Sequence, residues 1–319
     1  MTPPRSMRRV LVTGGAGFIG SHIAEALVAK DTDVTVVDNL STGFTDNLKS
    51  LEGRIRIERL DLVDGDIAAL LANDFDAIIH AAANAYIPTS IEDPERDLLD
   101  NVIATHRLLA AVRKVSPKTS FVYISTAAVY GEGSGVPITE DELTRPVSPY
   151  GVSKLAAEHY VTLYARLYGL KTNAVRLFSV YGPRLRKQVV WDFMTRLAAN
   201  PEELIINGDG TEERDLNHVG NVVAAVLLVA ERGDMTGDVY NVAARDSVSI
   251  DELARMLSKA MGINPSFGHT GQTRPGHARS WKADISRLEA LGHLPAIGYE
   301  AGLADTVAWF RADHSTSAR

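Results

Sequence analysis

The chain has 319 residues, of which 45% are hydrophobic, enough for one large core or two. The formal net charge is −7 and the basic residues form no long cluster, so the composition argues against a nucleic-acid partner. The sequence has no cysteine, which excludes a disulfide framework and is typical of a reducing compartment.

The apolar runs are too short for a membrane segment. The run at residues 10–13 is closed at once by glycines, whereas a signal peptide has a longer apolar region and a small-residue cleavage site. The longest run, residues 222–230, is far short of the ~20 residues that a membrane helix needs. We therefore expect a cytoplasmic protein without a membrane partner.

Short β-branched runs alternate with longer helical patterns along the first part of the chain. The runs that predict buried strands are residues 9–13, 33–38, 55–60, 75–82, 120–125 and 172–178. The helical patterns between them include residues 20–30, 97–115 and 149–169. This alternation predicts the α/β class, with a doubly wound parallel sheet of the Rossmann type that carries helices on both faces.

The pattern changes after Phe178, where loops lengthen and Gly and Pro become frequent. Residues 237–243 predict one more strand, which would return to the first sheet. We expect a first domain of residues 1–180 plus about 215–245, and a smaller C-terminal substrate-binding domain of about 181–214 plus 246–312. The polar residues 313–319 are expected to form a disordered tail.

Three glycines, Gly14, Gly17 and Gly20, lie directly between the first strand and the first helix. Their spacing is G-x-x-G-x-x-G, which permits a tight turn and brings helix N–H groups toward a pyrophosphate. A glycine triplet alone is weak evidence, but the strand-turn-helix context predicts a dinucleotide site.

Asp38 ends the next strand, about twenty residues beyond the glycines. A carboxylate there accepts hydrogen bonds from ribose hydroxyls and repels a 2′-phosphate, which favours NAD over NADP. The alternative is an aspartate that only caps a turn.

Other polar and small residues follow the later strands. Asp61 comes after the third strand, and the alanines 81–83 after the fourth would let the backbone approach a flat cofactor. We interpret His80 as a core histidine with satisfied hydrogen bonds. Asn101 lies in a helix, where asparagine is a mediocre helix former, so a hydrogen-bonding role is plausible.

The segment "SPYGVSK" starts a helix with Tyr150 and carries Lys154 one turn later, and Ser125 and Thr126 end a strand about two dozen residues before it. Carboxyl ends of strands face the ligand crevice of a doubly wound sheet. A free tyrosine, with a pKa near ~10, is a poor base at neutral pH. Lys154 and an oxidised nicotinamide ring could lower that pKa by ~3 units, which requires them to stabilise the phenolate over the phenol by roughly 4 kcal/mol. The alternative is an ordinary surface turn.

Eight blocks occur in order: "TGGAGFIG", "DNLSTG", "HAAA", "STAAVYG", "SPYGVSK", "RLFSVYGPR", "GDGTEERDLNHV" and "RPGHARSWKADISRLEALG". Together they resemble the extended short-chain dehydrogenase/reductase family, specifically its NAD-dependent nucleotide-sugar epimerases and dehydratases of the UDP-glucose 4-epimerase type. The resemblance runs from Val10 to about Trp309.

The resemblance implies roles for individual residues. Tyr150 would be the general base and acid, Lys154 its tuner and a ribose ligand, and Thr126 the hydroxyl that orients the sugar oxygen. The implied NAD contacts are Gly14, Gly17, Phe18, Ile19, Gly20, Asp38, Asn39, Thr42, Gly43, Asp61, Leu62, Ala81, Ala82, Ala83, Asn101, Tyr150 and Lys154. The implied contacts to a nucleotide-diphosphate sugar are Ser125, Thr126, Ser179, Arg214 and Arg274, and no metal ligand is implied.

The resemblance favours a UDP-sugar 4-epimerase that works through a 4-keto intermediate. The family's 4,6-dehydratases have an Asp-Glu pair after the threonine, where this chain has Ala127 and Ala128. A decarboxylase or oxidoreductase of the same family stays open, as does a non-catalytic NAD-binding regulator.

Two further features are open to more than one interpretation. The basic loop Arg184, Arg186 and Lys187 could bind an anionic sugar such as a glucuronate, or could simply be solvated. Residues 156–169 carry apolar side chains around much of a helix, and we expect Val161, Leu163, Tyr164, Leu167 and Tyr168 to face a second copy in a homodimer, although an ordinary buried helix would look similar.

Overall fold

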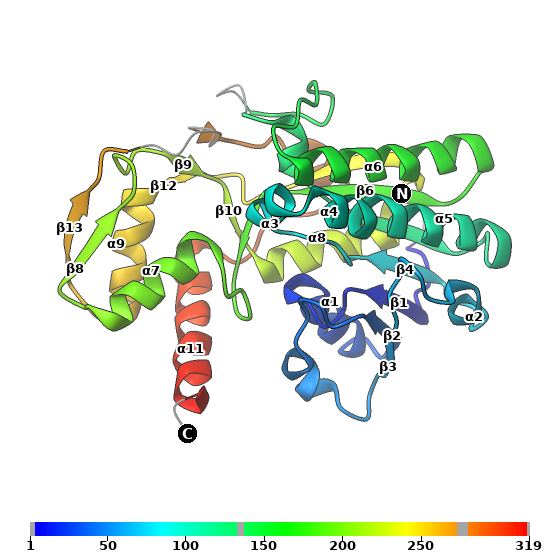
Figure 1. Cartoon of the computed structure of the whole chain (residues 1–319), viewed down its shortest axis with the longest axis horizontal. Helices are drawn as coiled ribbons and strands as arrows, with labels where there is room; N and C mark the ends of the chain where they lie inside the picture. The colour runs from blue at the N-terminus through cyan, green and yellow to red at the C-terminus, as the bar shows by residue number, and fades with distance from the viewer. Residues whose placement is uncertain (1–3, 133–136, 273–279, 318–319) are drawn as a thin grey trace.

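The computed structural model describes residues 4–132, 137–272 and 280–317, and its centre is a sheet of seven strands (Figure 1). The strand order is β11-β6-β5-β4-β1-β2-β3, and every pairing in this sheet is parallel. The strands are β1 (Arg9–Thr13), β2 (Asp33–Asp38), β3 (Arg56–Arg59), β4 (Ala77–His80), β5 (Ser120–Thr126), β6 (Thr172–Leu177) and β11 (Thr236–Val242). The order reverses between β1 and β4, and folds of this kind bind ligands at the carboxyl ends of the strands beside such a reversal. The predicted doubly wound α/β fold is confirmed, and the late strand does join this sheet.

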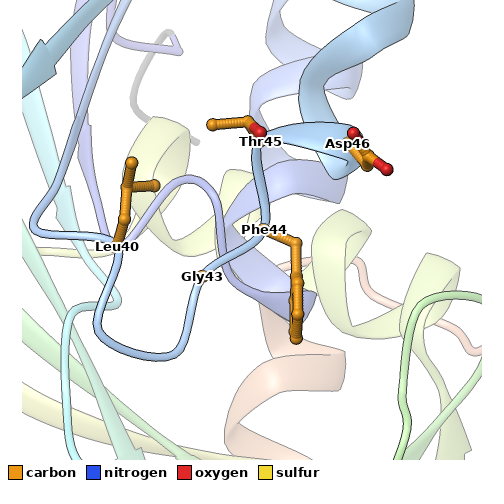
Figure 2. Close-up of a pocket in the computed structure, with 5 residues that line it drawn as sticks. All are labelled: Leu40, Gly43, Phe44, Thr45 and Asp46. Carbon is orange, nitrogen blue, oxygen red and sulfur yellow. The ribbon is translucent and has the colours of Figure 1, made fainter.

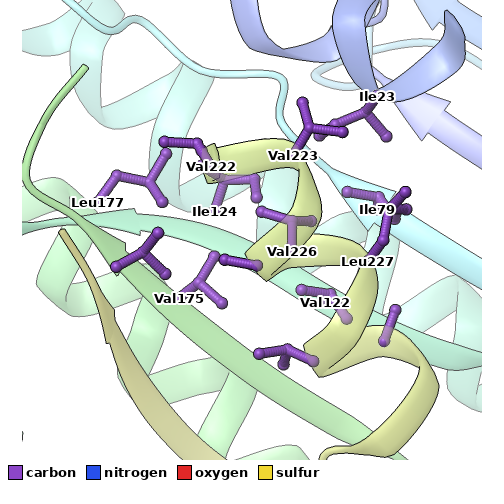
Figure 3. Packing of buried hydrophobic residues seen from close by; sticks show 14 of the residues in the cluster. Ile23, Ile79, Val122, Ile124, Val175, Leu177, Val222, Val223, Val226 and Leu227 are labelled. Atoms are coloured by element: carbon purple, nitrogen blue, oxygen red, sulfur yellow. The ribbon is translucent and has the colours of Figure 1, made fainter. Parts of the chain in front are cut away.

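Helices cover both faces of the sheet because alternate strand residues point to opposite faces. One apolar cluster packs α1 (Phe18–Val28) and α8 (Val219–Arg232) on one face, and Figure 3 shows Val222, Val223 and Val226 of α8 against strand residues. The other cluster packs α2 (Ile67–Leu71), α5 (Ala104–Val115) and α6 (Pro149–Tyr168) on the opposite face. Within the described ranges, no helix combines the length and apolarity needed to cross a bilayer.

One predicted strand differs in its environment. Residues 55–60 were expected to form a buried strand, but all four residues of β3 are exposed. This strand is the last in the sheet and pairs only with β2, so apolar residues such as Ile57 remain at the edge. Two arginines among its four residues are typical of an exposed edge strand.

The helix expected over residues 97–115 is divided. Short helices α3 (Ile87–Glu92) and α4 (Pro94–Leu98) come first, then a π-helical turn, η2 (Leu99–Ile103), and then α5. Helical segments with a π turn are often found at functional sites. Two 3₁₀ segments, η1 (Thr45–Leu51) and η3 (Ala127–Tyr130), follow β2 and β5.

After β6, the chain returns α8 and β11 to the sheet, whereas most of its other elements lie beside the sheet rather than on its faces (Figure 1). A third apolar cluster joins three of the later helices, α7 (Gln188–Ala199), α9 (Ile250–Met261) and α11 (Tyr299–Ser317). The other elements after β6, apart from α8 and β11, are β7 (Ser179–Tyr181), β8 (Glu203–Ile206), β9 (Glu213–Arg214), β10 (Leu216–His218), β12 (Val248–Ser249), β13 (Ser266–His269), β14 (Ser280–Trp281) and α10 (Ser286–Ala290).

The expectation of a disordered tail at residues 313–319 is wrong for residues 313–317, which continue α11. Asp313 forms an ion pair of 2.6 Å with Arg186, and the ring of His314 lies 5.6 Å from that of Trp191. The polar composition of this segment gave no sign of these contacts with residues more than a hundred positions earlier.

Candidate active site

The glycine turn between β1 and α1 packs closely against the chain's own backbone. Gly14 has φ +67°, and a Cβ atom on it would lie 2.6 Å from the backbone nitrogen of Ala82. Gly20 packs equally tightly, since a Cβ atom there would collide with the carbonyl oxygen of Gly14. Among the described residues, no side chain caps the start of α1 at Gly17, which leaves its first N–H groups for an anion. The turn therefore fits a pyrophosphate.

Asp38 is held firmly at the carboxyl end of β2. One carboxylate oxygen accepts a hydrogen bond from the N–H of Ala16 at 2.9 Å, and the other accepts one from the N–H of Leu40 at 2.8 Å. A Cβ atom at Gly43 would lie 2.9 Å from both oxygens, so only glycine fits there. These bonds fix the carboxylate beside the glycine turn.

The other residues expected to contact the cofactor differ in their partners and in their burial. Asn39 donates a hydrogen bond of 2.9 Å to Asp61. Burial raises the pKa of Asp61, but hydrogen bonds from the Val63 N–H, Asn39 and Arg96 outweigh it and leave that pKa below its usual value. Phe18, Ile19, Ala81, Ala82 and Ala83 are half-buried, Thr42 is exposed and Leu62 is buried.

The loop after β2 borders a surface hollow of about 360 Å³, lined by residues 40 and 43–46 (Figure 2). The side chains of Leu40 and Phe44 leave the loop in opposite directions in this view. The N–H of Phe44 donates to the carbonyl of Ala16, which ties the loop to the glycine turn.

His80 has the structural role that its sequence context suggests. It is fully buried; its Nδ1 lies 2.6 Å from the hydroxyl of Thr13 and its Nε2 lies 2.9 Å from that of Thr105. Burial, followed by the charge of Lys154, lowers the pKa of His80 to about 3. The ring is therefore neutral and satisfied, as expected of a core histidine.

Tyr150 stands in the first turn of α6, whose N-cap is Ser148. Its side chain is hydrogen-bonded with Thr126, at the end of β5, so the two elements meet at the carboxyl edge of the sheet. Burial raises the pKa of Tyr150 to about 12, and the bond with Thr126 lowers it only in part. The charge of Asp97 raises this pKa further, so the chain by itself does not produce the lowering that was expected from Lys154.

Lys154 is itself deeply buried one turn further along α6. Its Nζ lies 4.2 Å from the centre of the Tyr123 ring. Burial lowers the pKa of Lys154 to about 7, against the charges of Glu158 and Asp97, which raise it. The protonation of this lysine near neutral pH thus depends on two carboxylates.

A buried ion pair that the sequence did not predict begins one turn beyond Lys154 on α6. Glu158 and Arg176 approach within 2.6 Å, and their side chains are only 3% and 7% exposed. Ser125, an expected substrate contact, donates its hydroxyl hydrogen to Glu158 at 2.6 Å. The available signal was spacing, since Glu158 lies four residues after Lys154 and so shares its helix face.

The expected substrate contacts in the second half are less closely grouped. Ser179 begins β7, and Arg214 in β9 is half-buried and donates to the carbonyl of Glu213 at 2.7 Å. Burial lowers the pKa of Arg214, whereas the charge of Glu212 raises it. Arg274 lies outside the described residues.

The basic loop is engaged within the chain. Arg184 donates to Glu25 at 2.6 Å and to His22 at 3.0 Å on α1. Lys187 donates to the carbonyl of Ala85 at 2.8 Å. These contacts agree with neither a freely solvated loop nor one reserved for an anionic sugar.

Arg186 joins the two halves of the chain. It binds Asp313 of α11 through two hydrogen bonds, of 2.6 and 3.2 Å. Its guanidinium also lies 5.2 Å from the ring centres of both Phe44 and Trp309. The C-terminal helix is thereby linked to the loop beside Asp38.

Most of the chain is similar in sequence to one family of known proteins. The model of the NAD dependent epimerase/dehydratase family matches residues 10–243. The chain belongs to this family. Its cofactor is therefore NAD, in agreement with the glycine turn and Asp38.

Relatives within the family differ in reaction. The UDP-glucose 4-epimerase of Mycolicibacterium smegmatis is 35% identical, over 95% of this chain and 98% of that protein. The dTDP-glucose 4,6-dehydratase of Streptomyces griseus is 34% identical, over 96% and 95%. The crystal structure of the Thermotoga maritima UDP-glucose 4-epimerase with UDP-glucose superposes with a TM-score of 0.89 at 34% identity, covering 96% of this chain and 99% of that one.

Proposed function

We propose that the protein is a nucleotide-sugar epimerase, an isomerase that inverts C4 of a UDP-sugar through a 4-keto intermediate. The observation that carries the proposal is the meeting of Tyr150 and Thr126 at the carboxyl edge of the sheet. A phenol and a hydroxyl converging there can share one sugar oxygen, which is the geometry that proton transfer needs.

In this mechanism Tyr150 removes the proton of the C4 hydroxyl, Thr126 orients that oxygen, and Lys154 stabilises the phenolate. The glycine turn and Asp38 would hold NAD⁺, which would supply a positive ring and a reversible acceptor for the hydride of C4. Tyr150 then gives the proton back to the same oxygen. Arg214 and Arg274 would hold the diphosphate, since guanidinium groups suit phosphate oxygens.

Two other functions, a 4,6-dehydratase and a non-catalytic regulator, fit the site less well. At the positions of the dehydratase Asp-Glu pair, Ala127 and Ala128 form the start of η3 and have no proton to transfer. A non-catalytic NAD-binding regulator would have no need for Thr126, Tyr150 and Lys154 together. A decarboxylase or oxidoreductase acting on the same substrates stays the alternative.

The test is incubation of the purified protein with a panel of UDP-, dTDP-, GDP- and CDP-sugars. NMR should reveal formation of a C4 epimer from at least one UDP-sugar, without net NADH. Loss of water or CO₂ from the sugar, or net reduction of the cofactor, would replace the epimerase by one of the alternatives.

The preference for NAD should depend on Asp38. Asp38→Asn keeps the shape but removes the charge that repels a 2′-phosphate, so we expect the ratio of Kd for NADP to Kd for NAD to fall by about tenfold or more. Both dissociation constants are measured by titration of the same variant. Damage to the loop that Asp38 holds would weaken both cofactors and leave their ratio unchanged. An unchanged ratio would reject the ribose role of Asp38.

We also propose a homodimer. Leu163, Leu167 and Tyr168 are exposed on α6, and Leu167 is 61% exposed. Val161 and Tyr164, which were expected on the same surface, are buried against the chain's own sheet, because they point to the inner face of the helix. Sedimentation equilibrium should give about twice the 34.5 kDa chain mass, and a monomer at micromolar concentration would contradict the proposal.

A further inference from the structure

Asp97 is a buried carboxylate that neither the proposed mechanism nor the cofactor site uses. It lies in α4 and is 1% exposed. One of its oxygens accepts a hydrogen bond of 2.5 Å from the hydroxyl of Ser153, and the other accepts one of 3.0 Å from the amide of Asn101. Both oxygens are thus satisfied by uncharged donors.

These contacts join three segments around the start of α6. Ser153 lies between Tyr150 and Lys154 in the sequence, and its hydroxyl is also 3.0 Å from the carbonyl of Tyr150. Asn101, in the π-helical turn, donates to Ser153 at 2.9 Å and accepts the N–H of Asn84 at 2.9 Å. Asp97 therefore helps to fix the turn that carries the acid–base pair.

In the part of the chain that the structure describes, four elements bring titratable side chains near Lys154, and two of these side chains are carboxylates. Glu158 lies on the same helix, Asp97 on α4, neutral His80 on β4 and the Tyr123 ring on β5. Glu158 is already paired with Arg176, whereas the hydrogen bonds to Asp97 come from neutral groups. Glu158 raises the pKa of Lys154 more than Asp97 does, but only Asp97 also contacts the start of α6 through Ser153.

We propose that Asp97 is a positioning residue for the acid–base pair: through Ser153 it fixes the first turn of α6, and its charge keeps the Lys154 ammonium protonated beside Tyr150. This inference rests on the proposed function of Tyr150 and Lys154. In this proposal Asp97 does not contact the substrate, and it affects the reaction only through Tyr150 and Lys154.

The charge of Asp97 raises the pKa of both Tyr150 and Lys154. Activity needs Tyr150 deprotonated, which sets the acid limb of the pH–rate profile, and Lys154 protonated, which sets the alkaline limb. Removing the negative charge lowers both values, so both limbs must move in the same direction, toward lower pH.

The experiment compares pH profiles of kcat for the NAD-loaded wild type, Asp97→Asn and Ser153→Ala. Asp97→Asn keeps the shape but removes the charge, and its profile should move down by about 1 pH unit. Ser153→Ala keeps the charge but removes the contacts of the Ser153 hydroxyl with Asp97, Asn101 and Tyr150, and its profile should stay in place while its kcat falls. Asp97→Ser serves as the second neutral variant if the asparagine is poorly tolerated.

An unmoved profile in the neutral Asp97 variants, or an equal movement in Ser153→Ala, would overturn the inference. Both results are distinct from failure of the proposed function, in which Tyr150→Phe would retain activity. If Tyr150→Phe is inactive and the Asp97 profile is unmoved, only the role of Asp97 is lost.

Discussion

Replacing Tyr150 with phenylalanine is expected to lower kcat by about 10³-fold while NAD stays bound, because the general acid and base is lost and the ring is kept. The phenol hydroxyl forms a hydrogen bond with Thr126, which the variant loses. The glycine turn and Asp38, which would hold the cofactor, lie on other elements and should be unchanged.

The measurements are epimer formation by NMR at saturating substrate and the amount of NAD released on denaturation. Tyr160→Phe is the matched control, since it makes the same change on the same helix at a residue that is 38% exposed. Its turnover should match the wild type. If Tyr150→Phe kept more than about a tenth of the activity, Tyr150 would not be the acid–base group.

Replacing Glu158 with alanine is expected to lower the free energy of unfolding by about 3–5 kcal/mol, because Arg176 would keep a buried charge without its partner. Burial alone would lower the pKa of Arg176, but the bonds and charge of Glu158 more than offset it and raise that pKa above its ordinary value. The hydroxyl of Ser125 would also lose its acceptor.

Urea denaturation followed by circular dichroism measures the effect. Glu300→Ala breaks an ion pair with Lys259 whose side chains are 88% and 79% exposed, and it should cost less than about 0.5 kcal/mol. The double variant Glu158→Leu/Arg176→Met should recover most of the loss, because no unpaired charge is left. Equal losses in Glu158→Ala and Glu300→Ala would show that the buried pair has no special weight.

The order of strands and helices could be predicted from the sequence because each parallel strand is a short apolar run between helical patterns. The glycine turn and Asp38 could be located for the same reason, since they follow or end a strand, and Tyr150 could be located because Ser148 and Pro149 mark the start of α6. Predicting His80 as a satisfied core residue worked because it ends a fully buried strand.

What could not be predicted depends on contacts between distant segments. Asp97 meets Ser153 because α4 packs against the start of α6, and the pairing of Glu158 with Arg176 joins a helix to a strand. The rise in the pKa of Tyr150 follows from the degree of burial, which a spacing of four residues does not reveal.

Arg186 contacts Trp309 and Asp313 of the last helix and also lies near Phe44, in the loop that follows Asp38. We therefore expect substitutions of Trp309 or Asp313 to change how long NAD stays bound between catalytic cycles, without changing the rate of the hydride transfer itself. Tags or fusions that distort this end of the protein would then yield preparations depleted of cofactor, which added NAD should restore.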